Sequence, residues 1–462
     1  MPSASAVVAS GTRVAERVLV PGSNILVLGH AREGKAAARF LAGYDLKVTV
    51  ADRSITETEW RGGVTLASES AVDLEGVDAV VVSPGIPSDN HVLAEAERRD
   101  LLITNGTQLF LELAPCPVIG ITGSSGKSTT SSLTAAILRV GGRPVGLGGN
   151  IGHPMLDLLP ELHPDSVAVV EMSSFQLELV RQSPHVAVVT NLSPNHLDRH
   201  GSMDAYAQAK RRIVAYQRRG DVVVVNGDDQ ASIGLVDGSV GEHVTFSWDR
   251  QEDSGAFVAA GEVVRRRNGV EDPVIPVSEL PLPGRHNLEN ALAAVAATNV
   301  FDVPTDSVRK AIAAFTGLPH RLQRTAEIGG VTYVDDSIAT SPERAAVGMR
   351  SVRGPVVWIA GGRSKHLPWD LVLDAGLERV HAVVLVGEAS DEIDAAIREY
   401  PGWSSVDVVR AESLDRAVAV AAGRAHPGDT VLFSPGGTSF DQFADFEARG
   451  RAFQSAVRGL RG

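Results

Sequence analysis

Short runs rich in valine and isoleucine alternate with longer stretches rich in alanine and leucine along the whole sequence. Continuous apolar runs are typical of strands that are buried on both faces of a sheet. A helical stretch between two such runs supplies the long crossover that parallel strands need. The alternation therefore predicts an α/β protein built from parallel sheets that helices cover.

The chain has 462 residues, more than the roughly 250–300 residues at which a single hydrophobic core stops growing. We therefore expect three domains, at residues 1–105, 106–317 and 318–462. The first and third are expected to be Rossmann-like, and the second is expected to bind a mononucleotide. The polar segment 247–270 is interpreted as a hairpin or a mobile loop.

The strands that we expect in the first domain end in turn residues or a carboxylate, so they should form one ligand crevice at their carboxyl ends. Helices are expected at 36–41, 287–297 and 307–315. The predicted strands are 24–29, 47–52 and 78–85 in the first domain, 117–122, 166–171, 186–191 and 221–226 in the second, and 331–334, 356–360, 382–386 and 430–434 in the third.

Charge and cysteine content exclude several classes of protein. The formal net charge of -13 argues against a general nucleic-acid binder, because such binding depends on lysine and arginine. The only cysteine, Cys116, excludes an intramolecular disulfide and a cysteine-rich zinc site. No basic leader and no apolar run long enough to cross a bilayer is found. We expect a cytoplasmic protein, most simply a monomer, that does not insert into membranes.

The strongest local motif is a glycine-rich loop between a predicted strand and a predicted helix. Glycines let the backbone turn tightly and direct its amides at phosphate oxygens, and the helix N-terminus adds to the attraction. Ile121 stands where the strict phosphate-loop spacing requires glycine, so the motif is a variant; a glycine-rich turn with a solvated lysine is the alternative. The residues predicted to bind ATP here are Gly123, Ser124, Ser125, Gly126, Lys127, Ser128 and Thr129.

A phosphate loop needs a carboxylate nearby to hold Mg²⁺, and Ser128 can add a hydroxyl ligand. Glu171 ends a predicted strand and fits this role, although it could instead cap the next helix. His196 follows a neighbouring strand, where a histidine can equally be an ordinary polar residue. Lys210 lies in a helical stretch, and its surroundings in the sequence predict a surface lysine.

Together these motifs resemble those of the Mur ligases, which add amino acids to the peptidoglycan precursor in the cytoplasm. The resemblance covers nearly the whole chain, and it is strongest to the branch of the family that adds glutamate. It rests on the segments 83–86, 148–152, 171–177, 195–199, 284–290, 317–321, 335–337 and 439–443.

The resemblance implies a reaction with two steps. ATP phosphorylates the carboxylate of UDP-N-acetylmuramoyl-L-alanine, and the amino group of D-glutamate then attacks the acyl phosphate, so that ADP and phosphate leave. Positioning and charge neutralisation by lysine and Mg²⁺ are the main demands of phosphoryl transfer. ATP and Mg²⁺ are therefore the expected cofactors.

The resemblance also implies roles for individual residues. Lys127, Glu171, His196 and Lys210 match the family's catalytic positions; Ser128, Glu171, His196 and Lys210 match its metal site, with Lys210 as a carbamylated lysine. Asn287, Asn290, Arg321 and Asp336 match further ATP contacts. The UDP-substrate pocket is expected at Arg32, Glu33, Asp52, Arg53, Ser54, Ser83 and Asn150, where both arginines could also be merely solvated. Glutamate is expected at Thr340, Lys365, Ser439 and the backbone near Phe446.

One position departs from the family pattern. Ile338 stands where many members carry a lysine, so the same ligation with L-glutamate is an alternative. A folylpolyglutamate-synthase-like ligase or another P-loop NTPase is a more distant alternative, as is a nicotinamide dehydrogenase. Ala31 argues against the last, because it replaces the second glycine of a dinucleotide fingerprint.

Overall fold

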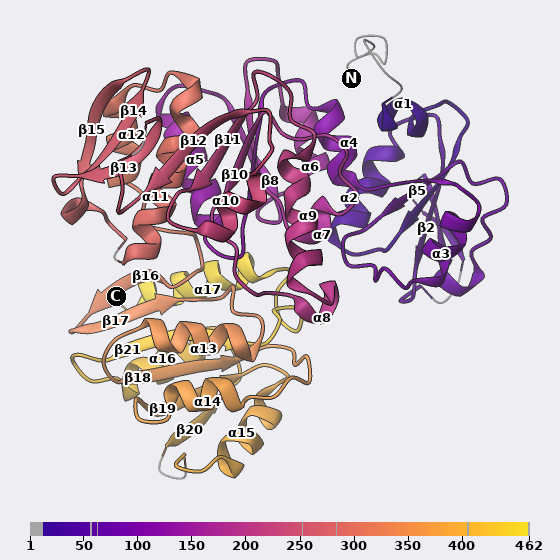
Figure 1. The fold of residues 1–462 in the computed structure, drawn as a ribbon. Helices are drawn as coiled ribbons and strands as arrows, with labels where there is room; N and C mark the ends of the chain where they lie inside the picture. Colours follow the sequence, from indigo (N-terminus) through magenta and orange to yellow (C-terminus); the bar gives the residue numbers. More distant parts are fainter. Residues whose placement is uncertain are drawn as a thin grey trace. The chain divides into compact units, whose positions relative to one another are not determined.

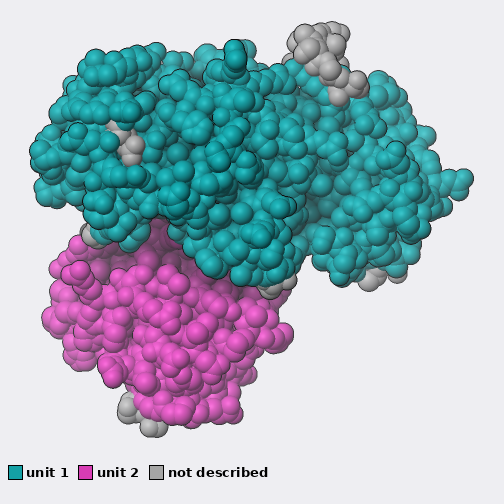
Figure 2. Space-filling view, viewed as in Figure 1, with its two compact units in different colours: residues 1–315 teal, residues 316–462 magenta. Residues whose placement is uncertain are grey.

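The computed structural model of the chain describes residues 13–55, 58–61, 63–251, 253–282, 284–403 and 406–460. The chain forms two compact units, Met1–Phe315 and Thr316–Gly462 (Figure 2). The first unit contains two sheets and the second contains one. Each sheet falls within one of the three expected domains, while the domain boundaries themselves stay a prediction.

The first sheet has the strand order β3-β4-β2-β1-β5-β6 and is parallel except for the edge pair β3–β4 (Figure 1). Its central strands are apolar runs whose side chains are buried on both faces. Its strands are β1 (Asn24–Leu28), β2 (Lys47–Asp52), β3 (Glu59–Arg61), β4 (Val64–Ser68), β5 (Ala79–Val82) and β6 (Leu102–Thr104); the helices are α1 (Val14–Val18), α2 (Arg32–Leu41), α3 (His91–Arg98) and α4 (Gly106–Leu113).

The second sheet has nine strands in the order β15-β14-β13-β12-β11-β10-β7-β9-β8. It is parallel from β8 to β13, and β13, β14 and β15 add an antiparallel edge, so the hairpin interpretation of 247–270 is confirmed. Its strands are β7 (Val118–Thr122), β8 (Val145–Gly149), β9 (Val167–Glu171), β10 (Val186–Val189), β11 (Val222–Asn226), β12 (Glu242–Ser247), β13 (Gly255–Ala259), β14 (Glu262–Arg267) and β15 (Val270–Pro276).

Helices cover both faces of this sheet (Figure 1). Helix α11 (Arg285–Thr298) packs against α5 (Lys127–Val140), and its alanine-rich second half is buried. Alanine favours the helix and lets the two backbones approach closely. The other helices are α6 (Met155–Leu158), α7 (Ser174–Leu177), α8 (Leu197–His200), α9 (Met203–Ala215), α10 (Gln230–Val236) and α12 (Thr305–Ala313).

The second unit has a sheet with the order β16-β17-β21-β18-β19-β20, parallel except for the edge pair β16–β17. Separate apolar clusters fill its two faces. The strands are β16 (Gln323–Ile328), β17 (Val331–Asp335), β18 (Val356–Gly361), β19 (Val380–Val386), β20 (Asp407–Ala411) and β21 (Thr430–Gly436); the helices are α13 (Pro342–Ser351), α14 (Asp370–Gly376), α15 (Ser390–Glu399), α16 (Leu414–Arg424) and α17 (Phe446–Gly459).

All strands that the sequence predicted are present, and the α/β class is confirmed. Within the described part of the chain, none of the helices has the length and apolar character to span a bilayer.

Candidate active site

The glycine-rich loop joins the buried strand β7 to helix α5, as predicted. Gly123 and Gly126 have φ angles of 150° and 79°. A Cβ atom at Gly123 would lie 1.9 Å from the Thr190 hydroxyl, and one at Gly126 would lie 2.3 Å from Oδ1 of Asn290. Both positions therefore require glycine, and the loop closes around the N-terminus of α5, where an anion is favoured.

Asn191 shapes the first half of this loop. Its carbonyl accepts a hydrogen bond from the amide of Ser124 at 2.9 Å, and its side-chain oxygen accepts one from the amide of Ser125 at 2.9 Å. The hydroxyl of Ser124 donates to the carbonyl of Ser193 at 2.8 Å. The loop is thus held from the end of β10, the strand next to β7 in the sheet.

Glu171 ends β9 and is buried beside the loop. One of its oxygens accepts from the Ser128 hydroxyl at 2.6 Å, and the other accepts from the side-chain amide of Asn150 at 2.8 Å. The next helix is capped by Ser173, so the alternative that Glu171 caps this helix is wrong. A hydroxyl and a carboxylate side by side at a phosphate loop are hard oxygen donors that fit Mg²⁺.

Lys210 is buried, so the expectation of a surface lysine from its local sequence is wrong. Its Nζ donates to the carbonyl of Gly123 at 2.8 Å and to the hydroxyl of Thr122 at 3.2 Å, and it lies 4.8 Å from the centre of the Tyr206 ring. Tyr206, Lys210 and Ile213 share the buried face of α9, at the i, i+4, i+7 spacing of one helix side.

The pKa of Lys210 is lowered from 10.5 to about 6, chiefly by burial and also by the positive charge of Lys127, while Glu171 opposes the shift. The two lysines meet at one acceptor, because Nζ of Lys127 also donates to the carbonyl of Gly123, at 2.9 Å. Two lysines and one carboxylate therefore converge on the base of the phosphate loop.

His196 is exposed and has a left-handed backbone, with φ of 54°. Its ring centre lies 5.3 Å from that of Phe175, which also stacks on His200 at 4.9 Å. The His200 ring in turn lies 5.2 Å from that of Tyr206. An aromatic cluster thus connects the loop that carries His196 to the helix that carries Lys210.

The predicted amides lie near the N-terminus of α5. Asn290 is buried and accepts from the Thr130 hydroxyl at 3.4 Å. Asn287 and Thr129 line a shallow pocket whose other walls are apolar. Apolar walls with one amide among them suit a heteroaromatic base. The apolar lining residues are Leu133, Leu280, Pro281, Leu282, Ala291, Ile312 and Phe315.

Arg32 begins helix α2, beside the first sheet, and its side chain contacts a loop that follows a strand of the second sheet. Its Nη2 donates to the carbonyls of Gly149 at 2.8 Å and Gly152 at 2.6 Å, on the loop that contains Asn150. Because Asn150 contacts Glu171, the predicted UDP-substrate pocket and the predicted metal site are joined through this loop.

The other residues predicted for the UDP-substrate lie around the carboxyl ends of β1, β2 and β5. Ser83 donates to the carbonyl of Gly29 at 3.2 Å. Burial opposes ionisation of Asp52, but hydrogen bonds from Ser54 and from the His30 amide outweigh it and lower the pKa of the carboxyl. Arg53 pairs with Glu69 at 3.0 Å, and its side chain is 70% exposed, so both alternatives for it stay open.

Glu33 lies at the start of α2, beside Arg32. Its side chain accepts from the amide of Gln176 at 3.4 Å, which is a second link to the second sheet's loops. Burial raises the pKa of Glu33, and the charge of Arg32 opposes this. The sequence did not single out Gln176.

In the second unit, the predicted residues follow the carboxyl ends of β17, β18 and β21. Asp336 is buried and accepts from the Ser434 hydroxyl at 2.7 Å and the Leu322 amide at 3.2 Å. Burial raises its pKa from 3.8 to about 7 despite these hydrogen bonds and the charge of Arg321. Arg321 itself is exposed.

The predicted glutamate-binding residues are spread over these loops. Lys365 is exposed after β18, and its pKa is lowered by partial burial and by Arg344. Ser439 is buried after β21, and Thr340 is half-buried after β17. The carbonyl of Phe446 accepts from the Ser337 hydroxyl at 2.8 Å.

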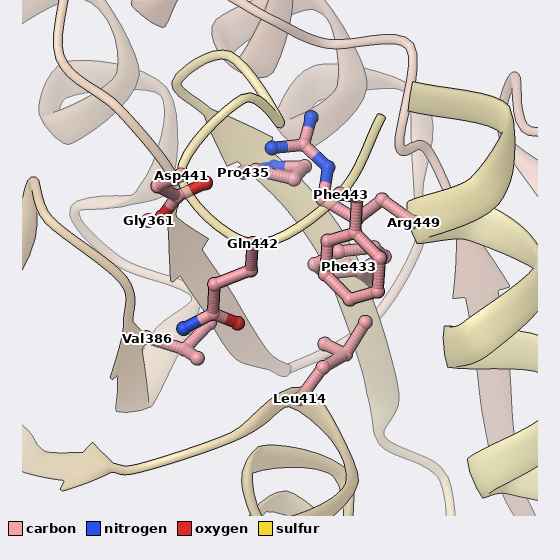
Figure 3. Close-up of a pocket in the computed structure, with 10 residues that line it drawn as sticks. Gly361, Val386, Leu414, Phe433, Pro435, Asp441, Gln442, Phe443 and Arg449 are labelled. Carbon is pink, nitrogen blue, oxygen red and sulfur yellow. The ribbon is translucent and has the colours of Figure 1, made fainter. Parts of the chain in front are cut away.

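Arg449 is a buried residue that the sequence did not indicate. It donates to the carbonyls of Ser337 at 2.8 Å and Gly437 at 3.0 Å, so it ties the loops after β17 and β21 together. Figure 3 shows its guanidinium group at a pocket that Asp441 and Phe443 also line. Burial lowers the pKa of Arg449 to about 10. The signal was weak, because an arginine in the first turn of a C-terminal helix usually faces water.

Two family models match the chain. The Mur ligase middle domain matches residues 121–298, and the glutamate ligase domain of the Mur ligases matches residues 320–437. Among curated proteins, the UDP-N-acetylmuramoylalanine--D-glutamate ligase of Symbiobacterium thermophilum is 39% identical, with 98% of this chain and 100% of the relative covered. The ligase of the same name from Koribacter versatilis is 36% identical, with 95% and 98% covered.

Solved structures share the fold. MurF from Acinetobacter baumannii matches with a TM-score of 0.55 and 19% identity, covering 95% of this chain and 92% of that one. The UDP-N-acetylmuramate-alanine ligase of Thermotoga maritima matches with a TM-score of 0.54 and 19% identity, covering 95% and 99%.

Proposed function

The chain belongs to the Mur ligase family, and from this premise we propose that it uses ATP to join D-glutamate to UDP-N-acetylmuramoyl-L-alanine. The observation that carries the proposal is the pair Ser128 and Glu171 at the base of a phosphate loop, in a chain 39% identical to such a ligase over nearly its full length. The reaction makes a precursor of peptidoglycan. We place it in the cytoplasm, where ATP is supplied.

In the first step, a carboxylate oxygen of the UDP-substrate attacks the γ-phosphorus of ATP, and the bond to ADP breaks. Lys127 and the amides at the start of α5 neutralise charge on the transferred group. Mg²⁺, held by Ser128 and Glu171, would supply further charge neutralisation when bound. His196 is proposed as an additional ligand. No covalent protein nucleophile is needed.

In the second step, the amino group of glutamate attacks the acyl carbon, loses a proton and displaces phosphate. The amine must be held close to that carbon, so the two carboxylates of glutamate need fixed partners. We propose Lys365 as the cationic partner, with Thr340, Ser439 and the backbone at Phe446 as hydrogen-bond partners. Asp336 and Arg321 are proposed to contact the nucleotide.

Lys210 is proposed to act as a carbamate. A neutral amine attacks the carbon of CO₂ and loses a proton, which leaves an anion where the lysine stood. The lowered pKa of about 6 keeps the amine neutral at physiological pH, as this reaction requires. The carbamate would be an oxygen ligand for a second Mg²⁺.

For the UDP-substrate we propose Arg32, Glu33, Asp52, Arg53, Ser54, Ser83 and Asn150. The contacts of Arg32 and Asn150 support this assignment, because they bring the first sheet's crevice to Glu171. The carboxylate of the UDP-substrate must reach the γ-phosphate of ATP. A substrate pocket that ends at Glu171, the proposed metal ligand, would bring the two groups together.

The enantiomer is tested by phosphate release with UDP-N-acetylmuramoyl-L-alanine, ATP and either D- or L-glutamate. Release with D-glutamate alone is expected. Release with L-glutamate alone would favour the second candidate, to which Ile338 points because it replaces a cation near the reacting groups. No release with either amino acid would contradict the proposed ligation.

A further inference from the structure

Among the described residues, one group of potential metal ligands lies apart from the site above. His381, His426 and Asp429 offer two ring nitrogens and a carboxylate oxygen that all lie within 4.8 Å of one another. His381 is the second residue of β19, and Asp429 immediately precedes β21. The cluster is therefore at the amino ends of the strands, whereas the proposed glutamate residues follow the carboxyl ends.

A rigid turn holds two of these side chains. The amide of Asp429 donates to the carbonyl of His426 at 3.0 Å, with Pro427 and Gly428 between them. Gly428 has φ of 97°, which a type II turn requires at its third position, and proline suits the second. The amide of His426 donates to Oδ2 of Asp429 at 2.7 Å. His426 and Asp429 are thus fixed at opposite ends of one turn.

The third side chain reaches this turn across the start of β18, which lies between β19 and β21. Nε2 of His381 lies 2.9 Å from Oδ2 of Asp429, and Nδ1 of His426 lies 3.6 Å from the same oxygen. The His381 and His426 rings are 5.8 Å apart between centres. Asp429 is buried while His426 is exposed, so the group is open on one side.

These separations are close to those of a tetrahedral zinc site. With zinc–ligand bonds of about 2.0–2.2 Å, ligand atoms lie roughly 3.3–3.6 Å apart, so rotations of the two histidine rings would bring all three ligand atoms, now within 4.8 Å of one another, to this spacing. Two imidazoles and a carboxylate are a donor set that zinc prefers, and the open side leaves the fourth position to water. Each histidine would bind through a deprotonated nitrogen, so any proton on that atom must leave.

We propose that His381, His426 and Asp429 form a binding site for Zn²⁺ or a similar divalent transition-metal ion. The bound ion joins the start of β19 to the turn before β21 and so fixes the amino edge of the second unit's sheet. The site is separate from the Mg²⁺ site proposed at Ser128 and Glu171, which has only oxygen donors on these two residues.

The alternative is an ion pair between His381 and Asp429 with no metal. The two alternatives assign different roles to His426. It is a ligand if a metal ion binds, and it is an ordinary surface side chain if only the ion pair forms. Its side chain is 79% exposed, so replacing it should leave the fold intact and remove only metal binding.

The experiment measures Zn²⁺ uptake of the full chain by equilibrium dialysis in excess Mg²⁺, which occupies the oxygen site. We expect the wild type to bind one more zinc ion than His426→Asn, with affinity at that site falling at least roughly 100-fold. His381→Asn should behave in the same way. His243→Asn, at an exposed histidine of the first unit, is the matched control and should bind like the wild type.

Two further readouts make the outcome unambiguous. Co²⁺ in place of Zn²⁺ should give intense visible bands of a tetrahedral site in the wild type and not in His426→Asn. Zn²⁺ should raise the unfolding temperature of the wild type and leave that of the variant unchanged. Zinc uptake by the wild type that does not exceed the uptake by the two variants would overturn the proposal.

Discussion

Replacing Lys210 with methionine separates what this residue costs in stability from what it contributes to the reaction. Methionine has a similar length and flexibility but carries no charge, so it fits the buried face of α9. The variant should lose ligase activity, because no carbamate can form. At neutral pH it should nevertheless be more stable than the wild type.

The size of this effect follows from the pKa of Lys210, which is 10.5 in the unfolded chain and about 6 in the folded one. Between these values the unfolded state binds a proton that the folded state does not, so stability falls by about 1.4 kcal/mol for each unit that the pH decreases. This loss of stability is absent at pH values above 10.5 and reaches its full size at pH values below about 6.

At about pH 7.5, three units below 10.5, the penalty is roughly 4 kcal/mol. The methionine variant escapes it but loses the hydrogen bonds to Gly123 and Thr122, which are worth about 1 kcal/mol each. We therefore expect a net stabilisation of roughly 2 kcal/mol at this pH, increasing towards pH 6 and reversing towards pH 10.

The assay is hydrogen exchange of the amides of β7 and β9, because the chain has two compact units and a bulk transition would mix them. Wild type and variant are compared at matched pH from about 6.5 to 9.5 in buffers free of CO₂. Lys310→Met, at an exposed lysine of α12, is the control and should show no pH-dependent difference. A difference between Lys210→Met and wild type that does not change with pH would refute the assigned burial and pKa.

Three further predictions concern the proposed ligands. Glu171→Gln should reduce kcat by at least ~100-fold and raise the Mg²⁺ concentration needed for half-maximal activity; an unchanged magnesium dependence would argue against this carboxylate as a ligand. Lys365→Ala should raise the KM for glutamate at least ~10-fold with little change for ATP, since a charged hydrogen bond is lost, while the exposed control Arg353→Ala should change neither. Asp336→Asn should gain stability over the wild type as pH rises from about 4 to about 7 and then level off, because the raised folded pKa favours the wild type only below the unfolded value of 3.8; hydrogen exchange of the amides of β17 and β21 measures this in the second unit, and a constant difference would contradict it.

The local parts of the site were predictable from the sequence. Gly123 and Gly126 are fixed by their own backbone angles and by the strand and helix on either side, all within one short segment. Glu171 was predictable because an apolar run ending in a carboxylate places that group at the carboxyl edge of a parallel sheet. Strand β8 was not identified, since its sequence is rich in glycine and lacks the apolar run of its neighbours.

Contacts between distant segments were not predictable. Lys210 is buried because its amine lies over the Tyr206 ring and reaches the carbonyl of Gly123, 87 residues earlier in the chain. Arg32 meets Gly149, 117 residues away, on a different sheet. The i, i+4, i+7 spacing of Tyr206, Lys210 and Ile213 on α9 places Lys210 on an apolar face of the helix. A lysine on such a face usually extends to the surface, so the spacing alone did not predict its burial.

The arrangement at Gly123 explains why the two lysines have different tasks. Both donate to the same carbonyl, so charging one disfavours charging the other, and burial makes Lys210 the one that is neutral. Lys127 lies in the phosphate loop itself, at the first position of α5, where phosphate charge must be neutralised. Carbamylation would convert Lys210 into an anion beside that cation and would therefore relieve the repulsion between them. Burial, with the charge of Lys127 beside it, thus keeps Lys210 in the neutral form that the proposed reaction with CO₂ would require.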